Sequence, residues 1–234
     1  MGGIGGIVVF GAGGRAGRAV TAEARRRGVA VTAVVREPAR YPDLGAEGVV
    51  VAKGDVTDPL SVGGVAGGGH VAAVHAVSPF SGPEQGFGSL DPDFFVRAAD
   101  ALLDGLGAAG VGRLVAIGLF ANLLGVDGRP VMDDAGVFPP EIRPFALAHT
   151  AGLSRLRSRG DEGAVDWVML TPGGGLEEGA ARTGRYRLGG ERVPEGGSVL
   201  SYADLAVAVL DEIETPMRHR VRVSVTGDSV IDGP

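Results

Sequence analysis

The stretch GAGGRAG, residues 11–17, is the first part of the chain whose residue types and spacing predict a chemistry. Gly11, Gly14 and Gly17 have the spacing GxxGxxG between the apolar run 7–10 and an Ala- and Arg-rich segment. Glycines in such a place let the backbone turn sharply and approach a diphosphate, which then lies at the positive N-terminus of the following helix. A plain tight turn is the alternative. The residues that we expect to hold the dinucleotide here are Gly11, Gly13, Gly14, Arg15, Ala16 and Gly17.

The end of the second apolar run indicates which dinucleotide is bound. The sequence there is VVREPAR, residues 34–40, and it places Arg36 where a carboxylate would hold the ribose hydroxyls of NAD(H). An arginine pairs with a 2′-phosphate through two parallel hydrogen bonds, and Arg15 is a second candidate for the same phosphate. We therefore expect NADPH or NADP+ as the cofactor. A solvated arginine at a strand end is the alternative.

The composition excludes several other chemistries. The 234 residues include no cysteine, which removes disulfides, thiolate catalysis and cysteine-based metal sites and fits a reducing cytoplasm. The formal net charge of −6 disfavours nucleic acid and anionic membranes as partners. No apolar run is long enough to span a membrane, the first residues do not form a signal peptide, and the four histidines are too scattered for a metal site. We expect a cytoplasmic monomer or homodimer.

The elements that position these residues alternate between strand-like and helix-like segments. We predict strands at 7–10, 29–35, 49–55, 70–77, 113–118, 166–172 and 220–225, and helices at 15–27, 94–109, about 145–159 and 201–213. Continuous apolar strands that alternate with helices indicate a parallel sheet covered on both faces. The predicted fold class is therefore α/β, a Rossmann-like doubly wound sheet. Residues 1–234 are expected to form one domain, in which the glycine-rich segment 173–200, with a short strand near 183–188, is a small C-terminal substrate-side extension.

Four motifs together resemble one family. The glycine turn, VVRxPxR, GDVTDP (54–59) and LSYADLAVAVLDEIE (200–214) are similar to the atypical short-chain dehydrogenase/reductases. The closest branch is the NmrA-like, NAD(P)H-binding group that includes biliverdin-IXβ/flavin reductase, and the resemblance covers nearly the whole chain. It implies that Asp55 contacts the adenine amino group, with backbone contacts from Val56. An Asp55 that caps the next helix is the alternative. The resemblance also implies that Val77, Ser78 and Pro172, which end or follow strands, lie near the nicotinamide.

The catalytic residues of the larger family are missing. That family reduces carbonyls with a Tyr-x-x-x-Lys pair and a Ser, but the three tyrosines here are followed four residues later by glycine or alanine. The only lysine is Lys53, in a predicted strand. Matching FALAHTAGLSRLR to the family's helix places Ala146 at the Tyr position and Thr150 at the Lys position, and the Ser position falls near Gly118.

Other residues are candidates for acting on a substrate. His149 lies three residues after Ala146 and is a candidate general acid, although a packed or surface histidine is the alternative. Ser78 could bind cofactor ribose or substrate, or only start a turn. His75 is expected to be a packed strand residue. The candidate substrate-binding residues are Ser78, Pro79, Phe80, Phe120 and His149, where apolar loop side chains could line a slot for a flat aromatic ring.

These observations favour an NADPH-dependent oxidoreductase that reduces a ketone or quinone on a bulky aromatic small molecule, with the proton taken from substrate or water. The branch that the chain resembles includes ketoreductases of this kind. By analogy, an aromatic polyketide intermediate of antibiotic biosynthesis is the expected substrate. A flavin or biliverdin-type reductase is one alternative. A non-catalytic NADP(H) sensor is the other, because the Ser–Tyr–Lys set is gone.

Overall fold

The computed structural model describes residues 5–79, 90–160, 163–196 and 199–228, and its framework is a sheet of eight strands. The strands are β1 (Ile7–Phe10), β2 (Val31–Val35), β3 (Val49–Lys53), β4 (Ala72–His75), β5 (Arg113–Ile117), β6 (Asp166–Pro172), β8 (Tyr186–Leu188) and β10 (Val221–Gly227). They lie in the order β3-β2-β1-β4-β5-β6-β10-β8, and only β8 pairs antiparallel with its neighbour. The predicted doubly wound parallel sheet is confirmed.

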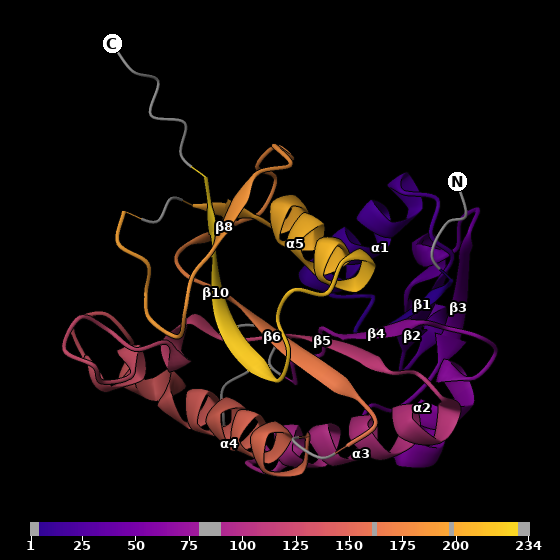
Figure 1. The fold of residues 1–234 in the computed structure, drawn as a ribbon, viewed down its shortest axis with the longest axis horizontal. Helices are drawn as coiled ribbons and strands as arrows, with labels where there is room; N and C mark the ends of the chain where they lie inside the picture. Colours follow the sequence, from indigo (N-terminus) through magenta and orange to yellow (C-terminus); the bar gives the residue numbers. More distant parts are fainter. Residues whose placement is uncertain (1–4, 80–89, 161–162, 197–198, 229–234) are drawn as a thin grey trace.

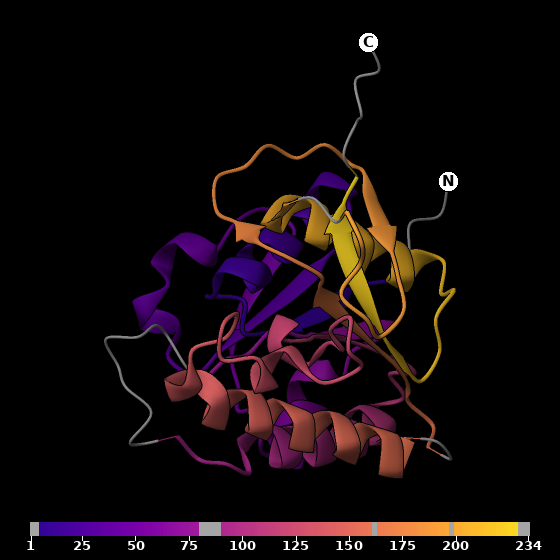
Figure 2. The same cartoon turned by 90° about the vertical axis from the view of Figure 1, so that its left-hand side faces the viewer.

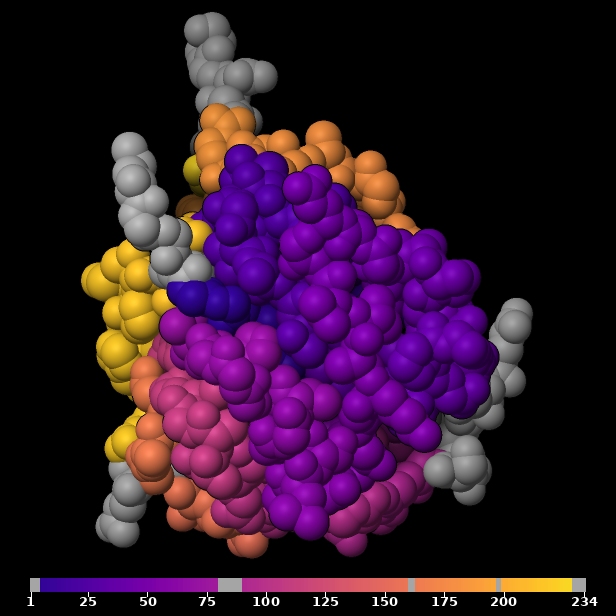
Figure 3. Space-filling view, turned by 90° about the vertical axis from the view of Figure 1, so that its right-hand side faces the viewer, coloured from indigo at the N-terminus to yellow at the C-terminus, as the bar shows by residue number. Residues whose placement is uncertain are grey.

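Helices cover both faces of this sheet, as Figure 1 shows. One face carries α1 (Arg15–Arg26) and α5 (Tyr202–Glu214), which pack against each other. The other face carries α2 (Pro59–Ala66), α3 (Phe94–Ala109) and α4 (Arg143–Gly160), packed in that order. Seen from the β3 edge, the surface is formed mainly by the N-terminal third of the chain (Figure 3).

The strands form here because their residues are apolar on both sides and both sides are covered. In β1, Ile7 and Val9 pack with the α1 and α5 layer, whereas Val8 and Phe10 pack with the α2 and α3 layer. All four are at most 1% exposed. Burial of both faces is typical of parallel strands between helices, and it explains the unbroken apolar runs of the sequence.

Charged residues fasten α1 to the C-terminal part of the chain. The Glu23 carboxylate is buried and accepts hydrogen bonds from Arg26, Arg27 and Arg182. Burial alone would raise the pKa of Glu23, but these arginines hold it below its ordinary value. Arg27 also pairs with Asp211 on α5 at 2.8 Å. Glu23 therefore ties α1 to the extension through Arg182, and Arg27 ties it to α5.

The connections that follow β5 and β6 lie at the carboxyl end of the sheet, as Figure 2 shows. The connection after β6 adds a small parallel pair, β7 (Leu176–Glu177) and β9 (Leu200–Ser201), which the sequence did not predict. The Ser201 hydroxyl accepts the Asp204 backbone N–H and caps α5. The Asp204 carboxylate accepts the backbone N–H groups of Thr183 and Gly184. These two hydrogen bonds hold the extension on α5.

Element boundaries differ from the predicted ones by a few residues. Helix α4 begins at Arg143, two residues before the predicted start, and β4 ends at His75 rather than at 77. The chain leaves β4 early because residues 76–78 turn toward the glycine turn after β1.

The contact between α3 and α4 predicts how one glycine responds to substitution. A Cβ at Gly152 of α4 would lie 2.5 Å from the Cβ of Phe95 on α3, too close for any real pair of carbons. We expect Gly152→Ala to lower the free energy of unfolding by about 1–3 kcal/mol, because the helices must separate. Gly107→Ala is the control: it also lies in a helix, but its nearest atom is 4.0 Å away. It should be neutral or stabilising by about 0.5–1 kcal/mol. Denaturant unfolding measures both, and equal effects would contradict the prediction.

Candidate functional site

The turn between β1 and α1 is held closely against the end of β4. Gly11 has φ +84, and a Cβ there would lie 2.6 Å from the carbonyl oxygen of Ala76 and 2.7 Å from the backbone nitrogen of Val77. A Cβ at Gly17 would lie 2.1 Å from the carbonyl oxygen of Gly11. Only glycine fits at either position, so the spacing of the motif reflects two separate steric requirements.

The N-terminus of α1 fits a phosphate group. Gly14 precedes the helix and, within the described residues, no side chain caps its first N–H groups and no acidic residue lies in its first turn. The backbone N–H groups of Arg15, Ala16 and Gly17 are therefore donors at the positive end of a helix, which is the arrangement that binds a diphosphate. A Cβ at Gly14 would have a single neighbour, 3.4 Å away.

Arginines surround this helix end. Arg36 is exposed directly after β2, and Arg40, 71% exposed, ends the short turn 38–40 and pairs with Glu37 at 3.7 Å. The Arg15 guanidinium lies on the side of the extension, 3.4 Å from the Glu178 carboxylate and 5.6 Å from the ring centre of Tyr202. Arg36 and Arg40 are thus available at the β2 end for a 2′-phosphate, whereas Arg15 would have to leave Glu178 to reach one.

A second group of side chains, which no local sequence pattern indicates, holds the glycine turn in place. The Tyr41 ring lies on Gly13, where a Cβ would be 2.4 Å from a ring carbon. Arg18 donates from Nε to the Gly13 carbonyl at 3.0 Å, lies 5.9 Å from the Tyr41 ring centre, and pairs with Asp43. Tyr41, Arg18 and Asp43 therefore fix the turn to the segment that follows β2.

Asp55 lies in the loop after β3 and is not a helix cap. Its Oδ1 accepts the Thr57 backbone N–H at 2.9 Å and the Thr57 hydroxyl at 2.7 Å, whereas α2 is capped by Asp58. Burial opposes ionisation of Asp55, but the hydrogen bonds from Thr57 and then the charges of Arg36 and Arg97 lower its pKa. Asp55 is therefore an ionised acceptor on the Arg36 side of the site, and Val56 beside it is buried.

The predicted nicotinamide end is only partly described. Val77 and Pro79 are half-buried and Ser78 is exposed, all directly after β4 beside the Gly11 turn. Phe80 lies outside the described residues. Pro172 is buried at the last position of β6. The loop after β4 and the end of β6 thus lie at the same edge of the sheet, and contacts of these residues with cofactor or substrate remain predictions.

An amide side chain contacts the two α4 residues at which the sequence comparison predicts the Tyr–Lys pair. Ala146 is fully buried, and Thr150, one turn later on α4, is half-buried. Asn122, from the short turn Phe120–Asn122 after β5, donates from Nδ2 to the Ala146 carbonyl at 2.8 Å and to the Thr150 hydroxyl. The Asn122 side chain therefore occupies the space over the two α4 positions where the Tyr–Lys pair is expected. Phe120 itself is half-buried and remains a candidate wall.

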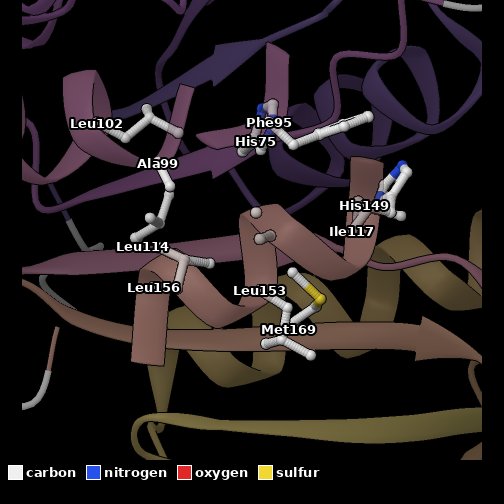
Figure 4. A pocket seen from close by; sticks show the side chains of 12 residues that line it. His75, Phe95, Ala99, Leu102, Leu114, Ile117, His149, Leu153, Leu156 and Met169 are labelled. Carbon is white, nitrogen blue, oxygen red and sulfur yellow. The ribbon is translucent and has the colours of Figure 1, made fainter. Parts of the chain in front are cut away.

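His149 is half-buried and packs in an aromatic cluster. Its ring centre lies 3.8 Å from that of Phe95 and 5.0 Å from that of Phe145. A cavity of about 20 Å³ lies between α3, α4 and the sheet. It has room for about one water. Figure 4 shows His75, Phe95 and His149 on one side of it and Leu102, Leu114 and Leu156 on the other.

Burial keeps both of these imidazoles neutral. It lowers the pKa of His75 to about 4, and burial together with the nearby His75 lowers the pKa of His149 to about 3. His75 is the packed strand residue that was expected. A neutral imidazole is a poor general acid at pH 7, so catalysis by His149 stays a prediction that would require its pKa to rise on ligand binding.

Comparisons with known proteins support the cofactor end of this site. A family model described as NAD(P)H-binding matches residues 11–216. The uncharacterised protein YwnB of Bacillus subtilis is 28% identical over 229 residues, which cover 95% of this chain and 99% of YwnB. A solved structure of a candidate epimerase from Bacteroides thetaiotaomicron has a TM-score of 0.80 at 31% identity, covering 97% of this chain and 98% of its own. A candidate NADH–flavin reductase from Streptococcus pneumoniae has a TM-score of 0.76 at 24% identity, covering 97% and 100%.

None of the helices in the described ranges is long and apolar enough to cross a membrane. Among the described residues, no group of three or more His, Asp or Glu side chains could hold a metal ion.

The two buried imidazoles predict how stability depends on pH. The unfolded chain protonates histidine near pH 6.5, whereas folded His75 and His149 do so only near 4 and 3. Above about pH 7 these two groups therefore do not reduce the free energy of unfolding. Below about pH 6.5 the free energy of unfolding falls, by at most about 1.4 kcal/mol per pH unit for each histidine.

His149→Phe tests this prediction, because phenylalanine keeps an aromatic ring in the cluster and removes the titrating group. Denaturant unfolding between pH 6.5 and 5 should show about half the wild-type slope of stability against pH. An unchanged slope would show that His149 does not titrate as its burial requires.

Proposed function

The chain belongs to the NAD(P)H-binding family, and on that premise we propose that it is an NADPH-dependent reductase of a ketone or quinone carbonyl on a bulky aromatic small molecule. The observation that carries the cofactor part is the uncapped N-terminus of α1 beside the Gly11 turn. When the cofactor is bound with its diphosphate at this helix end, its dihydronicotinamide supplies the hydride. The protein orients the dihydronicotinamide, excludes bulk water and allows a proton to reach the substrate oxygen.

The choice of NADPH over NADH rests on the residues after β2. Arg36 takes the place where an acidic residue would favour NAD(H). Arg36 and Arg40 are both exposed on the turn that leads to Tyr41. Two guanidinium groups there suit a 2′-phosphate, which accepts paired hydrogen bonds from arginine. Asp55, ionised and close enough to feel the Arg36 charge, suits the adenine amino group.

The substrate must compensate for the missing Tyr–Lys pair. Asn122 fills that space and its amide nitrogen is already bonded to Ala146 and Thr150. A phenol hydroxyl next to an aromatic ketone already hydrogen-bonds the carbonyl oxygen and would replace the lost donor. The proton then comes from that phenol or from water. An aromatic polyketide intermediate of antibiotic biosynthesis has this chemistry and is the substrate that we propose.

Two other functions have specific support. A flavin or biliverdin-type reductase agrees with the name of the Streptococcus pneumoniae protein, and a non-catalytic NADP(H) sensor agrees with the filled triad position. Epimerisation, suggested by the name of the Bacteroides protein, needs an acid and a base on opposite faces of the substrate. The ionisable group next to Ala146 is His149, and burial keeps it neutral. Epimerisation therefore has less support from the described residues than reduction has.

The function is tested by following NADPH absorbance as the protein meets polycyclic aromatic ketones, quinones and free flavin. We expect turnover of a ketone that carries a neighbouring phenol, and a loss of about tenfold or more when that phenol is methylated. Equal turnover of the methylated ketone would refute the role of the phenol. Tight NADPH binding without oxidation across the panel would favour the sensor.

Cofactor choice is tested at Arg36. We expect Arg36→Ala to weaken NADPH binding by about 10- to 100-fold, because a charge-assisted hydrogen bond of about 1.5–3 kcal/mol is lost, and to leave NADH binding nearly unchanged. Arg129→Ala, at an exposed arginine paired with Asp127, is the matched control. Titration of protein fluorescence gives both dissociation constants. Equal losses for the two cofactors would place the 2′-phosphate elsewhere.

A further inference from the structure

One histidine near the carboxyl end of the sheet has ring nitrogens that no described residue uses. His149 lies in the first half of α4 and is half-buried. Within the described residues neither of its ring nitrogens has a hydrogen-bond partner, and neither is sealed from water as Nδ1 of His75 is. A neutral imidazole has one N–H donor and one bare nitrogen that accepts. Both are therefore open to a ligand.

The ring of His149 lies at the end of the sheet where the hydride must be delivered. His75 ends β4 and Ile117 ends β5, and both line the same cavity as His149. Figure 4 shows His149 and Ile117 on the side toward which the β6 arrow points, which is the carboxyl end. Residues 77–78, predicted beside the nicotinamide, follow His75 by two and three positions, at most about 11 Å of extended chain.

Two buried phenylalanines hold the His149 ring in one orientation. The Phe95 ring lies along it, with the two planes 36° apart, and the Phe145 ring meets it edge-on, at an interplanar angle of 79°. Both phenylalanines are 5% exposed. A ring that is already fixed by its neighbours loses little freedom when a ligand binds. A hydrogen bond from this ring is therefore preorganised, as effective stabilisation of a developing charge requires.

The other polar side chains around Ala146 are already engaged or enclosed. Asn122 donates to the Ala146 carbonyl at 2.8 Å, and the Thr150 hydroxyl donates to the same carbonyl at 3.1 Å. His75 is only 9% exposed, and its Nδ1 is fully buried. Among these side chains, His149 is the one that can offer a hydrogen bond to a substrate oxygen.

We propose that His149, as a neutral imidazole, donates its N–H hydrogen bond to the carbonyl oxygen of the substrate. This inference rests on the proposed reductase function. When hydride adds to the carbonyl carbon, the C=O π electron pair moves onto the oxygen, and the His149 N–H stabilises the negative charge that forms. The neighbouring phenol transfers its proton to that oxygen, and the phenolate takes a proton from water. The ketone is reduced to an alcohol, the cofactor is oxidised, and His149 keeps its proton throughout.

This role differs from general acid catalysis, which needs a protonated imidazole. Burial and the nearby His75 hold the pKa of His149 at about 3, and His75 is itself neutral. The rings packed against His149, Phe95 of α3 and Phe145 of α4, carry no charge. A neutral imidazole can polarise a carbonyl, because one of its nitrogens carries an N–H in either tautomer. The substrate oxygen then receives two hydrogen bonds, one from its own phenol and one from His149.

Two substitutions of His149 separate hydrogen bonding from packing. His149→Phe keeps an aromatic ring in the cluster but has no donor, whereas His149→Gln keeps an N–H donor and loses the ring. In the reduction of a polycyclic aromatic ketone we expect kcat to fall by about tenfold or more in His149→Phe and by clearly less in His149→Gln. A role in packing alone predicts the opposite order. Wild-type kcat in His149→Phe, or a lower kcat in His149→Gln than in His149→Phe, would overturn the proposal.

The same two substitutions at His219 are the matched control. His219 is exposed and pairs with Asp166 at the start of β6, the opposite end of the sheet from His149. His219→Phe and His219→Gln should therefore both leave kcat unchanged.

The hydrogen bond itself is measured without turnover, by infrared difference spectroscopy of a hydroxyanthraquinone bound to the protein with NADP+, which has no hydride to give. We expect a carbonyl stretching band at lower wavenumber in the wild type than in His149→Phe, and equal bands would overturn the proposal. If this shift is seen but no ketone is reduced, the proposed function fails and the His149 contact stands. If wild type and His149→Phe reduce ketones equally well, the function stands and this inference fails.

Discussion

The architecture depends on one close contact, that of the glycine turn after β1 with the end of β4. β1 lies between β2 and β4 in the sheet, so the connections of the two halves of the fold diverge at this point. Doubly wound sheets bind their ligands at such a point, beyond the carboxyl ends of the strands. Gly11 can close on Ala76 and Val77 only because it has no side chain. The turn thereby aims the N-terminus of α1 at the crevice, and Tyr41, Arg18 and Asp43 keep it there.

The predicted substrate side of the site is formed by neutral polar groups. The Asn122 amide donates to the Ala146 carbonyl and the Thr150 hydroxyl, and burial keeps His75 and His149 neutral. Such a site does not provide a strong acid of its own. It suits a reaction in which the bound cofactor supplies the hydride and the substrate or water supplies the proton.

The sequence predicts the cofactor end better than the substrate end, and the reason is physical. The glycine turn, Arg36 and Asp55 stand next to strands whose apolar runs are visible locally, so their positions follow from the strand order. The position of Asn122 depends on a contact with Ala146, 24 residues later, and that of Tyr41 on a contact with Gly13 across the first crossover. The Asp204 carboxylate, likewise, accepts the backbone N–H groups of Thr183 and Gly184, about 20 residues earlier in the chain. No local pattern distinguishes these outcomes.

The pairing of α1 with α5 also has a consequence for the order in which the protein can fold during synthesis. Helix α1 leaves the ribosome well before Arg182 and Asp211, which complete its ion pairs. Until they emerge, one face of β1 and β2 has no helix α5 beside it, and Glu23 lacks a partner from the extension. A nascent chain that stops before α5 would expose apolar sheet surface and be prone to aggregation.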